Sequence, residues 1–98
     1  MNYDVRLREE AEIDLTEASI WYQEQQPGLG HEFIHEVSST LQSIQESPLS
    51  FPVIYRDMRR VLTRKLPFSI FYQIHTNTII VFGILHASRD PKRWRDRT

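Results

Sequence analysis

The fold of this chain is decided by residues 68–86, which read FSIFYQIHTNTIIVFGILH. Two runs rich in aromatic and β-branched residues, 68–75 and 78–86, are separated only by Thr76 and Asn77. Strands joined by so short a connection are antiparallel neighbours. We therefore predict a β-hairpin whose second strand ends in a histidine.

A third strand is predicted just before the hairpin, over residues 58–65, where basic side chains surround Val61 and Leu62. Residues 50–55 are expected to form a loop or a short edge segment, because Pro52 has no N–H to give to a strand ladder. Three strands that follow one another through short connections form an antiparallel meander.

The first half of the chain predicts one strand followed by two helices. Residues 2–8 alternate between polar and apolar side chains, which is the period of a strand. Residues 9–25 and 30–46 have helical patterns without proline, and the turn between them is Gln26-Pro27-Gly28-Leu29-Gly30. The order β-α-α-β-β-β predicts an α+β fold, with a helical hairpin packed on a small antiparallel sheet. Residues 1–98 are expected to form a single domain.

The first predicted helix carries more apolar surface than one sheet covers. One stripe is expected to face the core, and a second contains Ile13, Ile20 and Trp21. The second stripe needs another helix or a partner to cover it. We expect a docking groove there, and a homodimer through the stripe is the competing use.

The composition is that of a soluble globular protein: 40% of the 98 residues are hydrophobic, 26% are charged, and none is cysteine. There is no run of about 18 apolar residues, so neither a membrane-spanning helix nor a membrane partner is expected. The absence of cysteine excludes disulfides and thiolate metal sites. It fits a reducing compartment, and the expected location is the cytoplasm.

The net charge of −1 hides a strong asymmetry. Residues 1–49 contain ten Asp or Glu and two Arg, whereas residues 50–98 contain ten Lys or Arg and three Asp. A division of this kind creates a local field on a nearly neutral molecule. The basic half is therefore a candidate surface for nucleic acid or for an acidic protein.

Short motifs follow one another along nearly the whole chain. They are Ala11-x-x-Asp14-Leu15, Trp21-Tyr22, Pro27-Gly28-Leu29-Gly30 with Phe33, Pro48, Arg59-Arg60, Leu66-Pro67-Phe68-Ser69-Ile70-Phe71-Tyr72, and Ile84-Leu85-His86 with Arg89-Asp90-Pro91 and Trp94. This ordered set resembles the RelE/ParE superfamily, the toxins of bacterial type II toxin–antitoxin pairs. The resemblance implies growth arrest, neutralisation by a cognate antitoxin in a hetero-oligomer, and a role in antitoxin binding for the second stripe of the first helix.

The resemblance also implies one of two targets. RelE-like members cleave mRNA in the ribosome without a metal, and ParE-like members inhibit DNA gyrase. In a nuclease an imidazole moves a proton and cations stabilise the phosphorane. The candidate catalytic residues are then His86, Arg89 and Lys65. The candidates for contact with the target or its phosphates are Arg59, Arg60, Arg64, Lys65, Arg89, Arg93 and Trp94.

The tail after His86 favours binding over cleavage. RelE-like nucleases usually carry a tyrosine or a histidine beside basic and carboxylate groups at this end. The tail offers no tyrosine, and the indole of Trp94 cannot transfer a proton. The spacing from His86 to Asp90 also resembles ParE-like tails. We therefore expect gyrase inhibition, with mRNA cleavage as the alternative, so whether the chain is an enzyme stays open.

One motif suggests a metal site. Residues 31–35 match H-E-x-x-H, the zinc-binding helix of metalloproteases. At about 100° per residue, His31 and His35 lie away from the apolar stripe of the second helix and should face solvent. A catalytic zinc also needs a third protein ligand and a substrate groove. We expect neither a metal nor a cofactor.

Overall fold

The computed structural model describes residues 3–88 and 91–97. The elements in chain order are β1 (Asp4–Leu7), α1 (Glu9–Gln25), α2 (Leu29–Glu46), the 3-10 turn η1 (Pro48–Ser50), β2 (Val53–Tyr55), β3 (Met58–Leu62), β4 (Phe68–His75), β5 (Thr78–His86) and α3 (Lys92–Arg95). Both predicted helices are present, and the segment expected at an edge contains the short strand β2. Among the described residues, no helix is long and apolar enough to cross a bilayer.

The predicted hairpin forms the middle of a five-stranded sheet, in the order β1-β5-β4-β3-β2. Strands β4 and β5 are antiparallel, with Phe68 opposite His86 and His75 opposite Thr78. Strand β1 joins β5 in parallel, with Asp4 opposite Thr78. The α+β fold is confirmed, and the sheet is mixed. A parallel pair is possible here because the connection from β1 to β5 is long enough to return to the same end.

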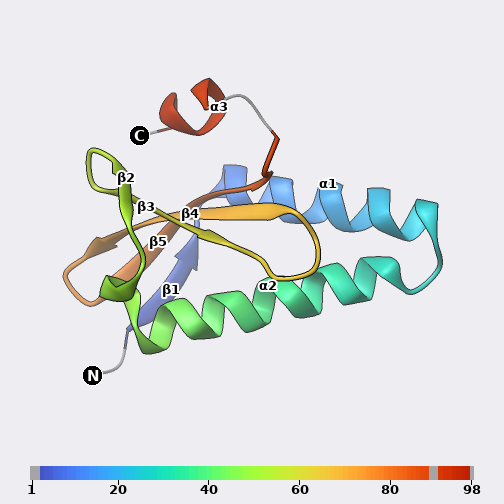
Figure 1. Ribbon diagram of the computed structural model, residues 1–98, viewed down its shortest axis with the longest axis horizontal. Helices are drawn as coiled ribbons and strands as arrows, with labels where there is room; N and C mark the ends of the chain where they lie inside the picture. The colour runs from blue at the N-terminus through green and yellow to red at the C-terminus, as the bar shows by residue number, and fades with distance from the viewer. Residues whose placement is uncertain (1–2, 89–90, 98) are drawn as a thin grey trace.

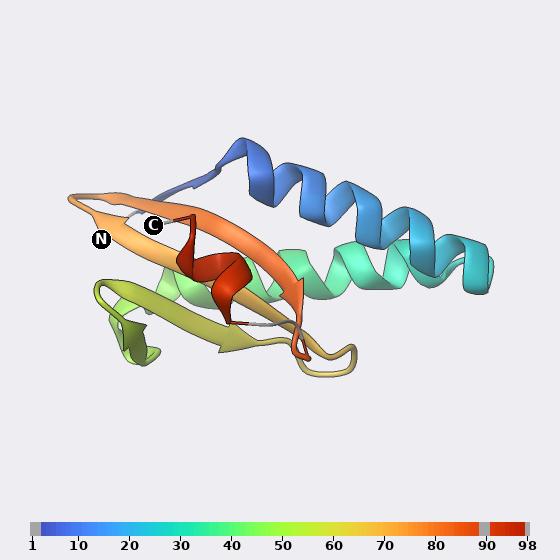
Figure 2. The same ribbon diagram turned by 90° about the horizontal axis from the view of Figure 1, so that it is seen from above.

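The two faces of the sheet are covered unequally. Helices α1 and α2 lie on one face, and the short α3 lies on the other (Figure 1, Figure 2). The main core lies under the helices, where Phe33 of α2, Tyr72 of β4 and Ile79 of β5 are fully buried. A smaller core on the other face joins Met58, Phe71, Phe82, Leu85 and Trp94. The smaller core holds the C-terminal helix against the sheet.

Tyr72 links the main core to the chain after α2. Its buried hydroxyl donates a hydrogen bond of 2.6 Å to the carbonyl oxygen of Pro48. Burial raises the pKa of Tyr72 to about 12, and the nearby Arg59 partly opposes this rise. The folded state therefore keeps a proton that the unfolded chain loses near pH 10, so this contribution to stability is present below pH 10 and is lost as the pH rises towards 12.

Replacing Tyr72 with Phe is expected to lower the free energy of unfolding by about 1–3 kcal/mol at neutral pH, because the Pro48 carbonyl loses its donor. The variant should also lose part of the decline in stability between pH 10 and pH 12. Urea unfolding followed by circular dichroism at pH 7, 10 and 11 measures both effects. An unchanged alkaline slope would contradict this role for Tyr72.

The turn between α1 and α2 depends on two glycines and one side chain. Gly28 has a φ of +92°, which favours glycine. The N–H groups of Gly28 and Gly30 donate to Oε1 of Gln23, at 3.1 and 3.2 Å. A Cβ added to Gly30 would lie 2.7 Å from the backbone oxygen of Ser19. The two helices therefore approach closely at Gly30.

Replacing Gly30 with Ala is expected to destabilise the protein by about 1–3 kcal/mol, as overpacking does elsewhere. The atom in the way is backbone of α1, so the helices themselves must separate. The matched control is Ser38 to Ala, on the exposed side of α2. It should change the midpoint of urea unfolding little. Equal midpoints for the two variants would show that the hairpin adapts to the added methyl group.

Candidate partner- and target-binding grooves

A groove of about 740 Å³ lies between α1, the end of β5 and α3. We call it the β5 groove. Its lining combines apolar side chains of α1 and of the ends of β4 and β5 with charged and polar groups. The lining residues are Asp14, Glu17, Ala18, Trp21, Tyr22, Phe68, Ile84, Leu85, His86, Ser88 and Arg93. The groove thus brings together residues predicted for antitoxin binding and residues predicted for target binding.

The partners of His86 orient its ring in the groove. The backbone N–H of Ser88 donates to Nδ1 at 3.1 Å, and the Ser88 hydroxyl lies 2.7 Å from the same nitrogen. Because an N–H can only donate, Nδ1 acts as the acceptor and the proton of the neutral ring lies on Nε2. The ring packs edge-on against Phe68, with centroids 5.5 Å apart. His86 can therefore donate one hydrogen bond from Nε2.

The C-terminal tail has no tyrosine, but Tyr22 brings a tyrosine to the same groove. It comes from α1 and reaches the β5 groove. Burial, and secondarily the negative charge of Glu36, raises the pKa of Tyr22. A raised pKa keeps the phenol protonated at neutral pH, so Tyr22 is not a general base there.

Helix α3 presents Arg93 and buries Trp94. The indole of Trp94 stacks on Phe71, with centroids 4.9 Å apart and planes at 18°, and meets Tyr55 edge-on. Trp94 is 7% exposed, so it packs in the smaller core and is not presented to a phosphate. Arg93 is exposed and lines the β5 groove. The anchored tryptophan therefore sets the position of the neighbouring arginine.

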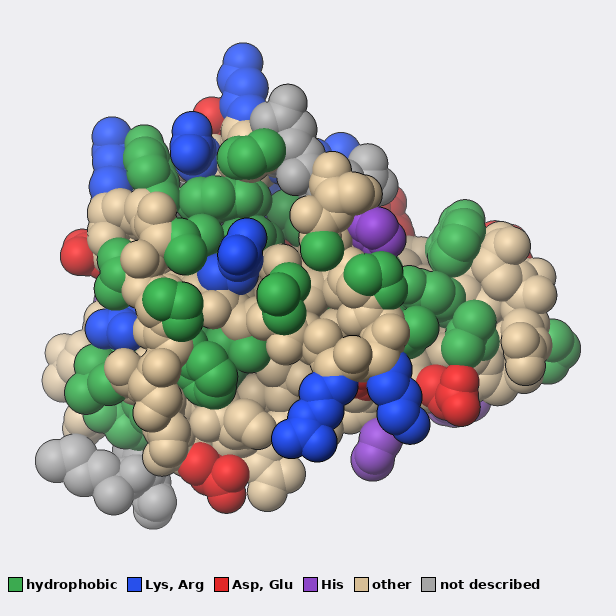
Figure 3. Space-filling model, in the orientation of Figure 1, with side chains coloured by type: hydrophobic (Ala, Val, Ile, Leu, Met, Phe, Trp, Pro, Cys, Tyr) green, Lys and Arg blue, Asp and Glu red, His purple; other side chains and the backbone are tan. Residues whose placement is uncertain are grey.

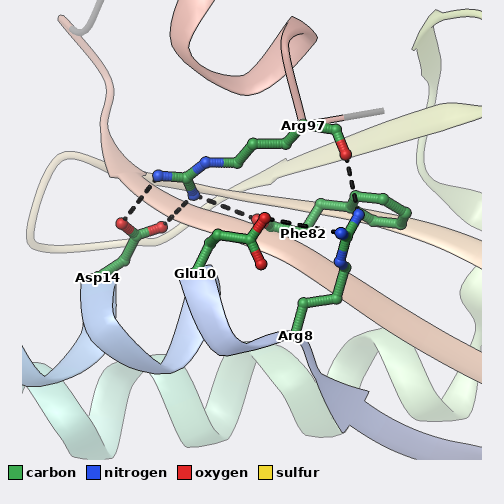
Figure 4. A network of polar contacts seen from close by, with 5 residues as sticks. All are labelled: Arg8, Glu10, Asp14, Phe82 and Arg97. Carbon is green, nitrogen blue, oxygen red and sulfur yellow. Dashed lines mark hydrogen bonds and ion pairs between the residues drawn. The ribbon is translucent and has the colours of Figure 1, made fainter.

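A buried ion pair, which the local sequence patterns do not predict, fixes the end of the chain. The guanidinium of Arg97 donates to both carboxylate oxygens of Asp14, at 2.6 and 3.2 Å, and to the carbonyl oxygen of Phe82 (Figure 4). Asp14 also accepts the N–H of Ile84 at 3.0 Å. The pairing of β5 with β1 ends at Val81. Beyond it, Arg97 binds the carbonyl oxygen of Phe82 and Asp14 binds the N–H of Ile84, so these two backbone groups of β5 also have partners.

Gly83 makes room for this ion pair. A Cβ at that position would lie 2.9 Å from Nη1 of Arg97 and 3.6 Å from Oδ2 of Asp14. Close approach of another group is a common reason for glycine inside a strand. The available sequence signals were the aspartate in the helix stripe of Ala11 and Leu15, and the glycine in β5.

Two predicted cations lie in a different groove. The predicted strand over 58–65 ends at Leu62, because Glu36 of α2 accepts the N–H groups of Lys65 and Leu66 at 2.5 and 3.0 Å and holds this segment in a loop. Arg64 and Lys65 therefore project from the loop towards α2. They line a second groove of about 520 Å³, together with His31, Glu32, His35, Glu36, Ser39 and Leu66.

The H-E-x-x-H segment lies on this second groove. His31 and His35 are both exposed, as the helical pattern predicts. Within residues 3–88 and 91–97, no three His, Cys, Asp or Glu side chains are placed to hold a metal ion. The segment is an exposed part of α2, and its imidazoles line the same groove as Arg64 and Lys65.

The remaining predicted cations have separate positions. Nη1 of Arg59 donates to the carbonyl oxygen of Phe51 at 2.5 Å, which ties the guanidinium to the chain before β2. Arg60 is exposed on β3, and Arg89 lies outside the described residues. Over the face that carries β2, β3 and α3, Figure 3 shows Lys and Arg side chains at several places and few Asp or Glu.

The predicted second stripe of α1 is exposed. Ile13 is 48% exposed, and Ile20 and Trp21 are each 55% exposed. Trp21 meets Tyr22 edge-on, with centroids 5.1 Å apart, and lines the β5 groove. The apolar stripe therefore continues into that groove.

The chain shares its fold with solved toxin structures. A chain of the chromosomal ParDE toxin–antitoxin system from P. aeruginosa gives a TM-score of 0.78 at 14% identity, covering 88% of this chain and 97% of that chain. A double mutant of the E. coli toxin RelE in the free state gives 0.70 at 16% identity, covering 99% and 94%. The RelBE2 complex from Mycobacterium tuberculosis gives 0.61 at 17% identity, covering 88% and 99%.

Sequence comparison gives the family. A search of curated proteins finds no match to this chain. Residues 5–91 match the family described as the ParE toxin of type II toxin–antitoxin systems, parDE. The match covers both long helices and all the strands except the first residue of β1. It confirms the resemblance to the RelE/ParE superfamily, and the chain belongs to the ParE toxin family of type II toxin–antitoxin systems.

Proposed function

We propose that this ParE-family toxin arrests growth by inhibiting DNA gyrase in the cytoplasm, and that a cognate antitoxin neutralises it by covering the β5 groove. The observation that carries the proposal is the division of the candidate catalytic residues between two grooves. His86 lines the β5 groove, whereas Lys65 lines the groove beside α2. A nuclease needs its acid, base and cations around one phosphate, within hydrogen-bond reach of it.

The β5 groove is better suited to binding than to proton transfer. Tyr22 stays protonated, Trp94 is buried, and the Nδ1 atom of His86 is already engaged by Ser88. Apolar side chains line the groove together with a few polar groups, among them Glu17, His86 and Arg93. A surface of apolar side chains with a few polar groups is the usual form of a protein-docking site. Gyrase or an antitoxin segment can use such a surface without any chemical step.

The alternative function is mRNA cleavage in the ribosome. The observation in its favour is that the Nε2–H of His86 and the guanidinium of Arg93 border the same groove. An imidazole and a guanidinium beside one phosphate can donate a proton and stabilise negative charge. Gyrase inhibition would stop DNA supercoiling, whereas mRNA cleavage would shorten mRNA, so one pair of assays distinguishes the two functions.

The test measures supercoiling by purified gyrase and, in parallel, mRNA integrity in a translating extract. The proposed function predicts loss of supercoiling and intact mRNA. Arg93→Glu should weaken the inhibition, because it reverses a charge at the groove. Arg6→Glu is the matched control, since Arg6 is an exposed arginine on β1 away from the groove. Cleaved mRNA with unaffected gyrase would establish the alternative, and no effect in either assay would overturn both functions.

A further inference from the structure

Helix α1 combines exposed apolar side chains with an entirely acidic set of charges. It carries six carboxylates and no Lys, Arg or His. Two carboxylates have partners: Asp14 binds Arg97, and Glu10 lies 3.6 Å from Arg8. Glu17 and Glu24 are exposed and make no ion pair with any described residue. The free face of α1 is therefore both apolar and negatively charged.

The unpaired carboxylates stand on the apolar stripe itself. At about 100° per residue, Glu17 lies about 40° and Glu24 about 20° from the direction of Ile13. Ile20 lies seven residues, about two turns, after Ile13 and so shares its direction. An isolated helix gains stability from opposite charges four residues apart, and this face of α1 has none. Its charges therefore remain available to a partner.

We propose that the exposed face of α1 is a docking surface for a basic amphipathic helix, supplied by the antitoxin. The repeat of apolar positions every seven residues is the pattern by which two helices pack side by side. Lys or Arg side chains beside the apolar ridge of the partner would face Glu17 and Glu24. Naming the antitoxin as the source rests on the proposed function, whereas the chemistry of the partner helix does not.

The β5 groove next to α1 indicates which charges the same partner should carry beyond the helix. The stripe continues through Trp21 into the β5 groove, which Glu17, His86 and Arg93 also line. A segment that leaves α1 and enters this groove meets Glu17 on the side of α1 and Arg93 on the side of α3. The partner segment is therefore expected to carry basic residues along α1 and an acidic residue only where it passes Arg93.

The test uses the full chain and two synthetic helical peptides with the same leucine ridge, one flanked by lysines and the other by glutamates. The lysine peptide should bind about tenfold more tightly at low ionic strength, and salt should reduce the difference. Binding should move the emission of Trp21 to shorter wavelength. The double reversal Glu17→Lys with Glu24→Lys should invert the preference. The matched control reverses two exposed carboxylates of α2, Glu32 and Glu46, and should leave it unchanged.

Equal binding of both peptides, or a preference that survives the reversal on α1, would overturn the inference. Self-association of the chain that competes with the lysine peptide would also overturn it, because the stripe would then bind a second copy. The peptide assay involves neither gyrase nor mRNA. A chain that fails in both of those assays can still select the lysine peptide, in which case only the antitoxin as its source is lost. If the protein inhibits gyrase but binds both peptides equally, only the basic partner helix is overturned and the proposed function stands.

Discussion

Replacing Arg97 with Met is expected to lower the free energy of unfolding by about 3–5 kcal/mol at neutral pH, the range seen when one partner of a buried ion pair is removed. The side chain of Asp14 is 7% exposed. Without the guanidinium, its carboxylate would keep only the N–H of Ile84 as a donor. Methionine fills a similar volume, so the loss reports mainly the unpaired charge. Urea unfolding followed by circular dichroism measures it.

Two further variants make this prediction specific. Glu10→Gln removes an ion pair whose side chains are each 41% exposed, and should cost at most about 1 kcal/mol. The double variant Asp14→Asn with Arg97→Met leaves no buried charge and keeps an acceptor for Ile84. It should therefore be more stable than Arg97→Met alone. If Arg97→Met costs no more than Glu10→Gln, the pair does not hold the end of the chain.

Local patterns in the sequence were enough to predict most of the fold. The predicted helix over 9–25 matches α1, and the helix predicted over 30–46 begins one residue earlier, at Leu29. The predicted hairpin matches β4 and β5. These elements were predictable because their apolar residues repeat with the period of one element and their connections are short. The parallel pairing of β1 with β5 was not predictable, because no local pattern indicates a partner more than 70 residues away.

The candidate site was harder to predict for the same reason. Exposure of Ile13, Ile20 and Trp21 follows from the periodicity of one helix. The bond from Arg97 to Asp14 spans 83 residues, so the position of Asp14 in an apolar helix stripe does not identify Arg97 as its partner. In the sequence, only its charge associates Lys65 with His86. The loop that Glu36 holds directs Lys65 towards α2 instead.

Substitution by Ala should lower the free energy of unfolding much more at one of the two tryptophans than at the other. Trp94 is 7% exposed and stacks on Phe71, so Trp94→Ala should cost about 3–5 kcal/mol. Trp21 is 55% exposed, so Trp21→Ala should cost no more than about 0.5 kcal/mol. The same urea titration measures both. Each variant also keeps a single tryptophan, so its emission reports either the smaller core or the stripe of α1.

The comparison also separates folding from docking. Trp94→Ala should loosen α3 from the sheet, so trypsin should cleave after Arg93 sooner than in the unaltered chain. Trp21→Ala should leave trypsin resistance unchanged and weaken binding of the lysine peptide. A stable Trp94→Ala variant would mean that the smaller core does not hold α3, and that the bond from Arg97 to Asp14 places Arg93 at the β5 groove. Undiminished peptide binding by Trp21→Ala would instead remove the tryptophan from the docking surface and leave Ile13 and Ile20 as its apolar contacts.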